Sequence, residues 1–283
     1  MRVFCLPVVA LRVFAACGDD APAISADVPS PVDGGTADAT TPDIEDASVA
    51  DADADAAPIP TRCLIDGVTH EADAIDPTNE CRQCRPSLSA TAWSSRGAVP
   101  IFTGGTAPAT QGWTVISGPP ATLTEGPDHL RLATTTSGSV GGWQLLYRTG
   151  VVPTDGPFAI RVELQIESVT AHNAFDSAAA ILGSYTPEHG SQRERTQMLY
   201  LDADGVGWGD DMSSASVAMT NGGYHVVELA VDADRKATVR VDGVGRVTRP
   251  DFTTNGTIAV GDQTADGGYD SALRIRSIAR VCL

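Results

Sequence analysis

The chain has 283 residues, of which 36 are acidic and 19 are basic, so the formal net charge is −17. This acidic excess excludes nucleic acid as an electrostatic partner, because phosphates require a surplus of Lys and Arg. Hydrophobic residues make up 42% of the chain, which excludes a wholly disordered protein. The 28 glycines and 18 prolines favour turns over long helices.

Residues 1–17 have the features of a signal peptide. A basic start at Arg2 precedes a short, mostly apolar run from Val3 to Leu11, and small residues precede Cys17. The apolar run is too short to span a bilayer as a helix of the mature protein. The sequence therefore predicts export.

The end of this segment, Phe14-Ala15-Ala16-Cys17-Gly18, resembles the bacterial lipobox. The resemblance implies cleavage before Cys17 and lipidation of its sulfur. We therefore expect a lipid-anchored protein at the outer membrane or the cell surface, with the lipid as its only membrane contact. The alternative is an ordinary cleaved signal peptide in which Cys17 has no special role.

Residues 18–60 carry eleven acidic residues and no basic one. The stretch is rich in Ala, Asp, Pro and Thr and has no aromatic residue. Such a composition cannot bury enough apolar surface to offset the entropy cost of ordering. The sequence predicts a disordered acidic linker.

Four cysteines remain after the signal peptide and its Cys17: Cys63, Cys81, Cys84 and Cys282. In an oxidising compartment an even number predicts two disulfides. Because Cys81 and Cys84 are close in sequence, we expect each to bond elsewhere, one to Cys63 and one to Cys282. A tetrahedral zinc site made by Cys63, Cys81, Cys84 and His70 is the alternative.

Residues 61–96 form a small Cys-rich module that is too short to hold a core without crosslinks. Its start, Cys63-Leu64-Ile65-Asp66-Gly67, its centre, Asn79 to Pro86, and the trailing Trp93 resemble a segment found in myxobacterial-type surface lipoproteins. The resemblance implies no chemistry. We interpret Trp93 as part of the core of this module.

Residues 97–283 contain about eleven alternating apolar segments separated by turn residues. In Phe158–Val169 apolar residues alternate with Arg161, Glu163, Gln165 and Glu167, which is typical of a strand with one buried face. Asp242-Gly243 is a strong hairpin signal, and Asp204-Gly205 is a weaker one. The other expected strands are Trp113–Ser117, Leu130–Thr134, Trp143–Arg148, Ala178–Tyr185, Thr196–Leu201, Tyr224–Val231, Ala237–Val241, Arg246–Arg249, Thr257–Val260 and Leu273–Val281.

Two runs, Gly223–Asp232 and Ala237–Gly243, resemble the concanavalin A-like or laminin-G-like jelly roll. Domains of that family carry an aromatic-His-Val strand, a polar turn and a strand that closes on Val-Asp-Gly. The tail Thr257–Gln263, followed by Asp270–Arg280, resembles the last two strands of the same fold. The resemblance implies an all-β antiparallel β-sandwich, a fold that hosts lectins, glycosidases, lyases and adhesion modules.

We find no catalytic set in the sequence. Glycosidases of this fold can carry E-x-D-x-x-E on one strand, but Gln165 stands between Glu163 and Glu167, so we interpret these two as a solvated face. A lyase would need a base and a cation. The residues that could supply them are Tyr185, His189, Arg193 and Arg195.

Calcium is the cofactor that the sequence could accommodate. Calcium takes six to eight oxygen ligands, and the carboxylates near the Asp204-Gly205 turn are its candidate ligands. They are Asp202, Asp204, Asp210 and Asp211.

A glycan-binding site needs an exposed aromatic face with amide or carboxylate partners nearby. Trp208 is the leading candidate, because Gly205, Gly207 and Gly209 give it no bulky neighbours. The other candidates for this site are Asp210, Tyr185, Asn221, Asp262 and Tyr269.

The leading functional hypothesis is a non-catalytic carbohydrate-binding or adhesion module whose partner is a glycan or cell-surface polysaccharide. A polysaccharide-degrading glycoside hydrolase or lyase is the second hypothesis. A structural envelope protein without a small ligand is the third. The sequence does not determine the oligomeric state.

Overall fold

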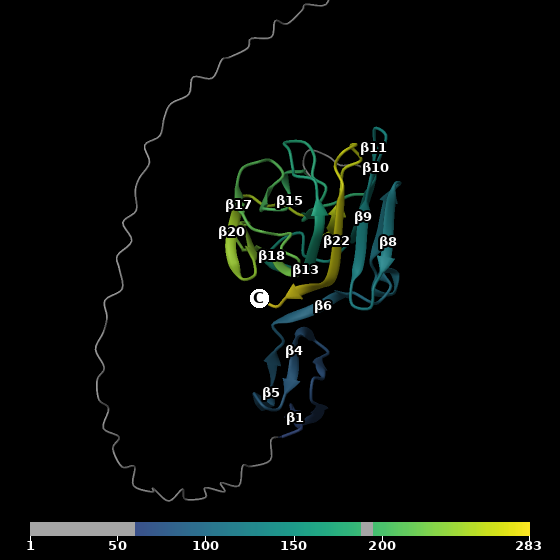
Figure 1. Cartoon of the computed structure of the whole chain (residues 1–283). Coiled ribbons are helices and arrows are strands. Elements are labelled where there is room, and N and C mark those ends of the chain that lie inside the picture. Colours follow the sequence, from purple (N-terminus) through teal and green to yellow (C-terminus); the bar gives the residue numbers. More distant parts are fainter. Residues whose placement is uncertain (1–59, 188–194) are drawn as a thin grey trace, which may run out of the picture. The chain divides into compact units, whose positions relative to one another are not determined.

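The computed structural model describes residues 60–187 and 195–283. Two antiparallel sheets pack face to face in these residues, so the predicted all-β antiparallel jelly-roll sandwich is confirmed (Figure 1). The predicted signal peptide, Cys17 and the acidic linker lie outside the described residues. Within the described part of the chain, no helix has the length and apolar composition needed to cross a membrane.

One sheet has eight strands, in the order β20-β19-β18-β13-β22-β9-β8, with β6 pairing to β22. Figure 1 shows β13, β22, β9 and β8 side by side. The strands are β6 (Ala98–Thr103), β8 (Ala121–Glu125), β9 (Leu130–Thr134), β13 (Phe158–Val169), β18 (His225–Val231), β19 (Ala237–Val241), β20 (Val244–Arg249) and β22 (Ser271–Val281).

The other sheet has seven strands, in the order β17-β16-β15-β14-β21-β12-β7. They are β7 (Thr114–Gly118), β12 (Trp143–Arg148), β14 (Ala180–Leu182), β15 (Met198–Leu201), β16 (Gly205–Trp208), β17 (Ser214–Ser216) and β21 (Ile258–Asp262). Outside the two sheets lie the 3₁₀ turn η1 (Pro108–Gln111) and the short pair β10 (Thr136–Ser137) and β11 (Val140–Gly141).

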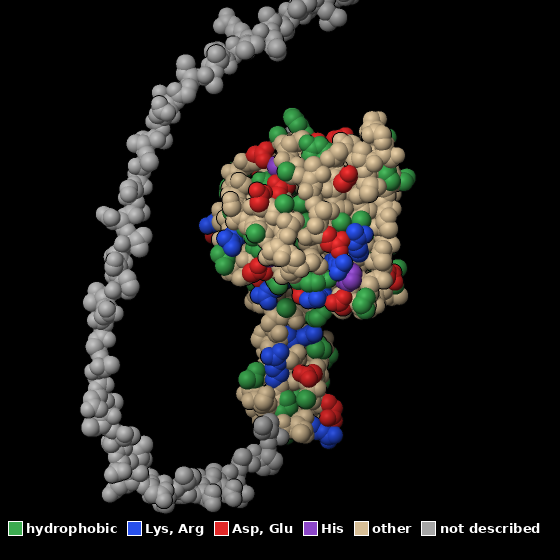
Figure 2. All heavy atoms as spheres, viewed as in Figure 1, with side chains coloured by type: hydrophobic (Ala, Val, Ile, Leu, Met, Phe, Trp, Pro, Cys, Tyr) green, Lys and Arg blue, Asp and Glu red, His purple; other side chains and the backbone are tan. Residues whose placement is uncertain are grey.

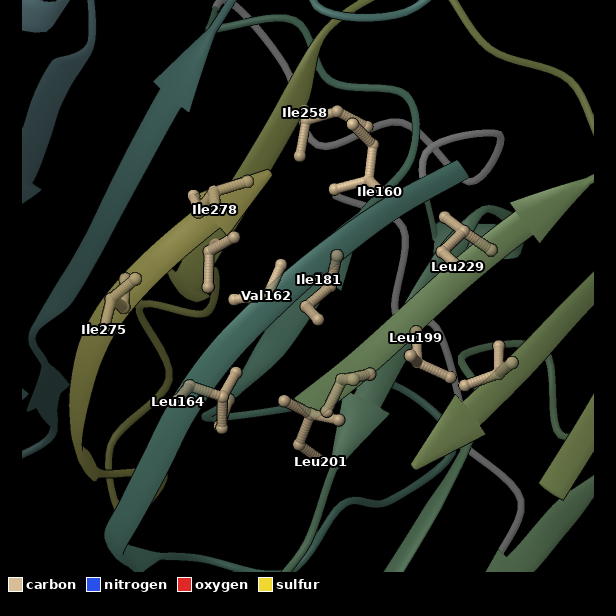
Figure 3. Packing of buried hydrophobic residues seen from close by; sticks show 14 of the residues in the cluster. Ile160, Val162, Leu164, Ile181, Leu199, Leu201, Leu229, Ile258, Ile275 and Ile278 are labelled. Atoms are coloured by element: carbon tan, nitrogen blue, oxygen red, sulfur yellow. The ribbon is translucent and has the colours of Figure 1, made fainter. Parts of the chain in front are cut away.

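The core lies between the two sheets, and the alternation in β13 explains how it forms. Ile160, Val162 and Leu164 point inward and are almost fully buried, and they meet Ile181 and Leu199 from the other sheet (Figure 3). At about 1.5–3 kcal/mol for each buried aliphatic side chain, this inner row supplies much of the driving force for sandwich formation.

Both predicted hairpins are present. Val241 pairs with Val244 across Asp242-Gly243, and both turn residues have positive φ, as a two-residue turn of this kind requires. The weaker signal at Asp204-Gly205 also marks a turn, because β15 and β16 pair across it.

The Cys-rich module consists of β1 (Arg62–Ile65), β2 (Val68–Glu71), β3 (Ile75–Asp76), β4 (Asn79–Arg85) and β5 (Ser89–Ser95). The predicted disulfides are confirmed as Cys63–Cys84 and Cys81–Cys282. The thiols are therefore occupied, which contradicts the alternative of a zinc site with His70. Trp93 packs against the small core of Cys63, Ile65 and Cys84, as expected.

Candidate functional site

Trp208 is a core residue, and the expectation that its ring is open is wrong. Its side chain is 0% exposed, and its Nε1 donates to the backbone oxygen of Thr248 at 3.1 Å. The neighbouring glycines do not leave an open space around the ring, because other residues occupy the room next to Gly207 and Gly209. A Cβ on Gly207 would overlap the ring of Tyr200, and one on Gly209 would lie 2.6 Å from the backbone oxygen of Arg195.

Asp262 is also unsuited to touch a sugar, because it is 1% exposed. Its side chain points into one end of the sandwich, where Thr134 Oγ1 donates to Oδ2 at 2.6 Å and the amide of Thr264 donates to Oδ1 at 3.1 Å. Burial raises the pKa of Asp262 to about 8. The carboxyl group is therefore mostly protonated at neutral pH and supports the loop that follows β21.

The remaining candidates for sugar contact do not form one site. Tyr185 is buried and packs on Tyr147 with ring centroids 5.4 Å apart. Asn221 lies in the turn before β18 and accepts from the amide of Gly223 at 2.8 Å. Tyr269 is partly buried, and its hydroxyl accepts from Asn173 Nδ2.

The four expected calcium ligands, Asp202, Asp204, Asp210 and Asp211, do not converge on one point. Asp210 pairs with Arg249, and Asp211 Oδ1 lies 2.8 Å from Nε2 of His172. Asp202 accepts from the backbone amide of His172 at 2.7 Å. Within residues 60–187 and 195–283, no group of three or more His, Cys, Asp or Glu side chains could hold a metal ion. The structure gives Asp202, Asp210 and Asp211 separate donors and does not bring them together as one set of ligands.

The carboxylates of β13 form ion pairs, as the solvated-face interpretation requires. Glu167 binds Arg131 at 2.7 Å and Arg274 at 2.6 Å, and Glu163 binds Arg276 at 3.0 Å. Of the residues that could make a lyase, His189 and Arg193 lie outside the described residues.

A groove of about 620 Å³ lies on the outer face of the eight-stranded sheet. Its two arginines, Arg161 and Arg240, both bind Glu228, at 2.6 and 2.8 Å. The other two carboxylates of the lining are also paired, Glu163 with Arg276 and Asp242 with His225.

The exposed aromatic ring is Phe175, which the sequence analysis missed. It is 66% exposed and is the one aromatic side chain of the described residues in the exposed class. It lies in the segment between β13 and β14, which we call the Phe175 loop (residues 170–179). Asn173 Oδ1 accepts from the amides of Phe175 at 2.7 Å and Asp176 at 2.9 Å. This Asx turn presents the ring to solvent.

Charged side chains lie near Phe175 in space and in sequence. The guanidinium of Arg195 lies 5.7 Å from the ring centroid, within the range of a cation–π contact. Asp176 accepts from Thr264 Oγ1 at 3.2 Å. Burial and a hydrogen bond with Asp266 raise the pKa of Asp176. Phe175 thus lies beside the guanidinium of Arg195 and precedes Asp176, whose carboxyl group is hydrogen-bonded to Asp266.

Figure 2 shows acidic, hydrophobic and histidine side chains close together at the upper end of the sandwich in this view. The chain direction explains why polar loops gather at one end. β13 ends there at Val169, and β21 ends there at Asp262, so the loops that follow both strands meet. The one signal for Phe175 in the sequence is an aromatic residue inside a polar run, His172-Asn173-Ala174-Phe175-Asp176, beyond the end of a strongly alternating strand.

No protein-family model matches the sequence, and no curated protein matches it. Among solved structures, the chain aligns with the carbohydrate esterase vb_24B_21 from the Shiga toxin-encoding bacteriophage phi24B. The identity is 15%, over 66% of this chain and 100% of that chain, with a TM-score of 0.45.

It also aligns with the Ca²⁺-bound form of the VIP36 exoplasmic/lumenal domain, at 9% identity over 67% of this chain and 93% of that chain (TM-score 0.47). The third alignment is with an endo-1,3-beta-glucanase from Streptomyces sioyaensis, at 13% identity over 67% and 99% of the two chains (TM-score 0.45). Because these TM-scores are below 0.5, the likenesses carry no argument about ligand, metal or activity. The fold class, an antiparallel jelly-roll sandwich, is assigned from the strand order of this chain itself.

Proposed function

We propose that the sandwich is a non-catalytic glycan-binding module and that Phe175 is its stacking residue. The observation that carries the proposal is the exposure of this one ring beside hydrogen-bonding side chains. Pyranose rings have an apolar face that packs on an aromatic ring, and a few fixed polar groups then select the sugar.

The polar groups next to Phe175 suit sugar hydroxyls. Asp176 and Asp266 supply carboxylate acceptors, and Arg195 supplies guanidinium donors. Carboxylates predominate at this end of the sandwich, since Asp211 is also half-exposed there. We therefore expect neutral or amino-bearing glycans to bind better than uronic acid polymers, because like charges repel.

The test is Phe175→Ala in the full-length protein, with affinity measured for a glycan identified on an array. Loss of stacking should cost on the order of 1–3 kcal/mol, by analogy with other ring ligands, which corresponds to a roughly 5- to 150-fold weaker affinity. Leu123→Ala is the matched control, because Leu123 is 41% exposed on β8, the edge strand of the eight-stranded sheet. Equal affinity of both variants and the wild type would show that the glycan does not bind at Phe175. If the wild type binds no glycan on the array, the result would favour a structural envelope protein.

We also propose that the protein is exported and anchored through a lipid on Cys17. The support is the lipobox-like end of the predicted signal peptide and the acidic linker that follows. Cys17→Ser should move the protein from the detergent phase to the aqueous phase in a phase-partition experiment. Partition of variant and wild type into the same phase would rule out the anchor.

A further inference from the structure

His172 contacts three segments near Phe175. Its backbone amide donates to Asp202, in the turn between β15 and β16, at 2.7 Å. Its Nδ1 lies 3.1 Å from the backbone oxygen of Asp176, and its Nε2 lies 2.8 Å from Asp211 Oδ1. The imidazole lies flat on Tyr200, with ring centroids 3.8 Å apart and an interplanar angle of 9°. These contacts fix the ring in position and direction, because the stacked ring cannot tilt without losing both nitrogen contacts.

The contact with Asp211 joins two loops. His172 belongs to the Phe175 loop, and Asp211 belongs to the segment between β16 and β17, which we call the Asp211 loop (residues 209–213). The residue next to Asp211 is Met212, whose side chain is 60% exposed. Each loop thus carries one large exposed apolar side chain, three residues or fewer along the chain from the contact that joins the loops.

An independent contact places the same two loops together. Arg195 extends its guanidinium over Phe175, while the backbone of Arg195 lies against Gly209 at the start of the Asp211 loop. The Asp211 loop itself is tight, since the amide of Asp211 donates to the oxygen of Trp208 at 2.8 Å and Asp211 has a φ of 59°. Arg195 therefore contacts both loops, and His172 provides the direct side-chain contact between them.

We propose that His172 is the positioning residue of the glycan site. By holding Asp211 it fixes the Phe175 loop against the Asp211 loop, so that Phe175 and Met212 form one apolar contact surface for the sugar. This inference rests on the proposed function only for the identity of the ligand; the link between the loops is a property of the free protein.

Hydrogen exchange tests the link without a ligand. The amides of Phe175 and Asp176, which donate to Asn173, report the order of the Phe175 loop. In Asp211→Ala their exchange should be faster by about tenfold or more, because a hydrogen bond to a charged group is lost. Asp211→Asn should restore slow exchange, since its amide oxygen can still accept from the imidazole. Asp251→Ala is the matched control, because Asp251 is an exposed carboxylate that, like Asp211, has a positive φ, so it reproduces the backbone strain of the Ala substitution.

Exchange of the β13 amides in the same samples shows whether each variant is folded. The proposal predicts unchanged exchange in β13, faster exchange at Phe175 and Asp176 in Asp211→Ala, and weaker binding of the array-identified glycan by that variant alone. Unchanged exchange at Phe175 and Asp176 would overturn it, and so would equal loss in Asp211→Asn. If exchange responds as expected but the wild type binds no glycan, the loop link stands and the proposed function fails.

Discussion

Asp262 should make the stability of the sandwich fall as the pH rises. Its carboxyl group is buried between the sheets, with Thr134 and the amide of Thr264 as its donors. Burial raises its pKa to about 8, and the negative charge of Asp270 acts in the same direction. In the unfolded chain the same carboxyl group has an ordinary pKa of about 3.9. Asp262→Asn removes the titration and keeps the shape and an acceptor for Thr264.

The sign follows from proton binding. Between about pH 4 and about pH 8 the folded protein holds a proton on Asp262 that the unfolded chain releases, so the folded state is favoured at the acidic end of this range. The pKa rises from 3.8 to about 8, and each pH unit is worth about 1.4 kcal/mol. The full contribution is therefore on the order of 6 kcal/mol, present below pH 4 and lost as the pH approaches 8.

Urea unfolding at a series of pH values between 4.5 and 8.5 measures this effect. Asp262→Asn should show a flatter profile than the wild type and should be the more stable protein at pH 8. Asp155→Asn is the control, because Asp155 is exposed in the loop before β13. Parallel profiles for wild type and Asp262→Asn would show that this carboxyl group is ionised in the folded protein, and the reasoning from burial would be wrong.

Three further changes probe the packing and the crosslinks. Trp208→Ala should destabilise the sandwich by about 3–5 kcal/mol, as expected for a buried aromatic ring, and thermal unfolding measures it. Gly207→Ala should cost about 1–3 kcal/mol because the new methyl group overlaps Tyr200; an unchanged melting temperature would show that the ring can move aside. Cys282→Ser opens a loop with a sequence separation of 201 and should lower the stability by up to about 5 kcal/mol, and identical urea midpoints for variant and wild type would refute this estimate.

The long strands could be predicted from the sequence because their alternation is strong. Phe158–Val169 and Ala237–Val241 have the predicted bounds, since each inward residue meets the core. The proximity of Cys81 and Cys84 predicted that each bonds to a distant partner, and the structure determines which bonds to Cys63 and which to Cys282.

The glycines next to Trp208 do not leave open space around its ring. In β16 they occupy the outer face, where Tyr200 uses the room, while Val206 and Trp208 alternate inward. The hairpin signal at Asp204-Gly205 already places Val206 and Trp208 on the same face of a strand.

Phe175 could not be found from local patterns. Its exposure depends on Asn173, whose side chain is held by Tyr269 from a loop almost a hundred residues away. The partners of the expected calcium ligands could not be predicted for a similar reason, since Arg249 and His172 contact Asp210 and Asp211 from distant parts of the sequence. Sequence spacing reveals which residues are close along one strand or turn, but these partners are set by how the two sheets pack.

The Cys81–Cys282 disulfide imposes an order on the maturation of the chain. Cys282 lies 201 residues after Cys81, so its thiol is synthesised long after those of Cys63, Cys81 and Cys84. Until Cys282 is available, Cys81 can react only with Cys63 or Cys84. A bond between Cys81 and Cys63 would leave Cys84 and Cys282 without their native partners. Because exchange between thiolates and disulfides can reverse such a bond, a supply of disulfide isomerase should raise the yield of the native protein, and a strong oxidant alone should trap it in the wrong pairing.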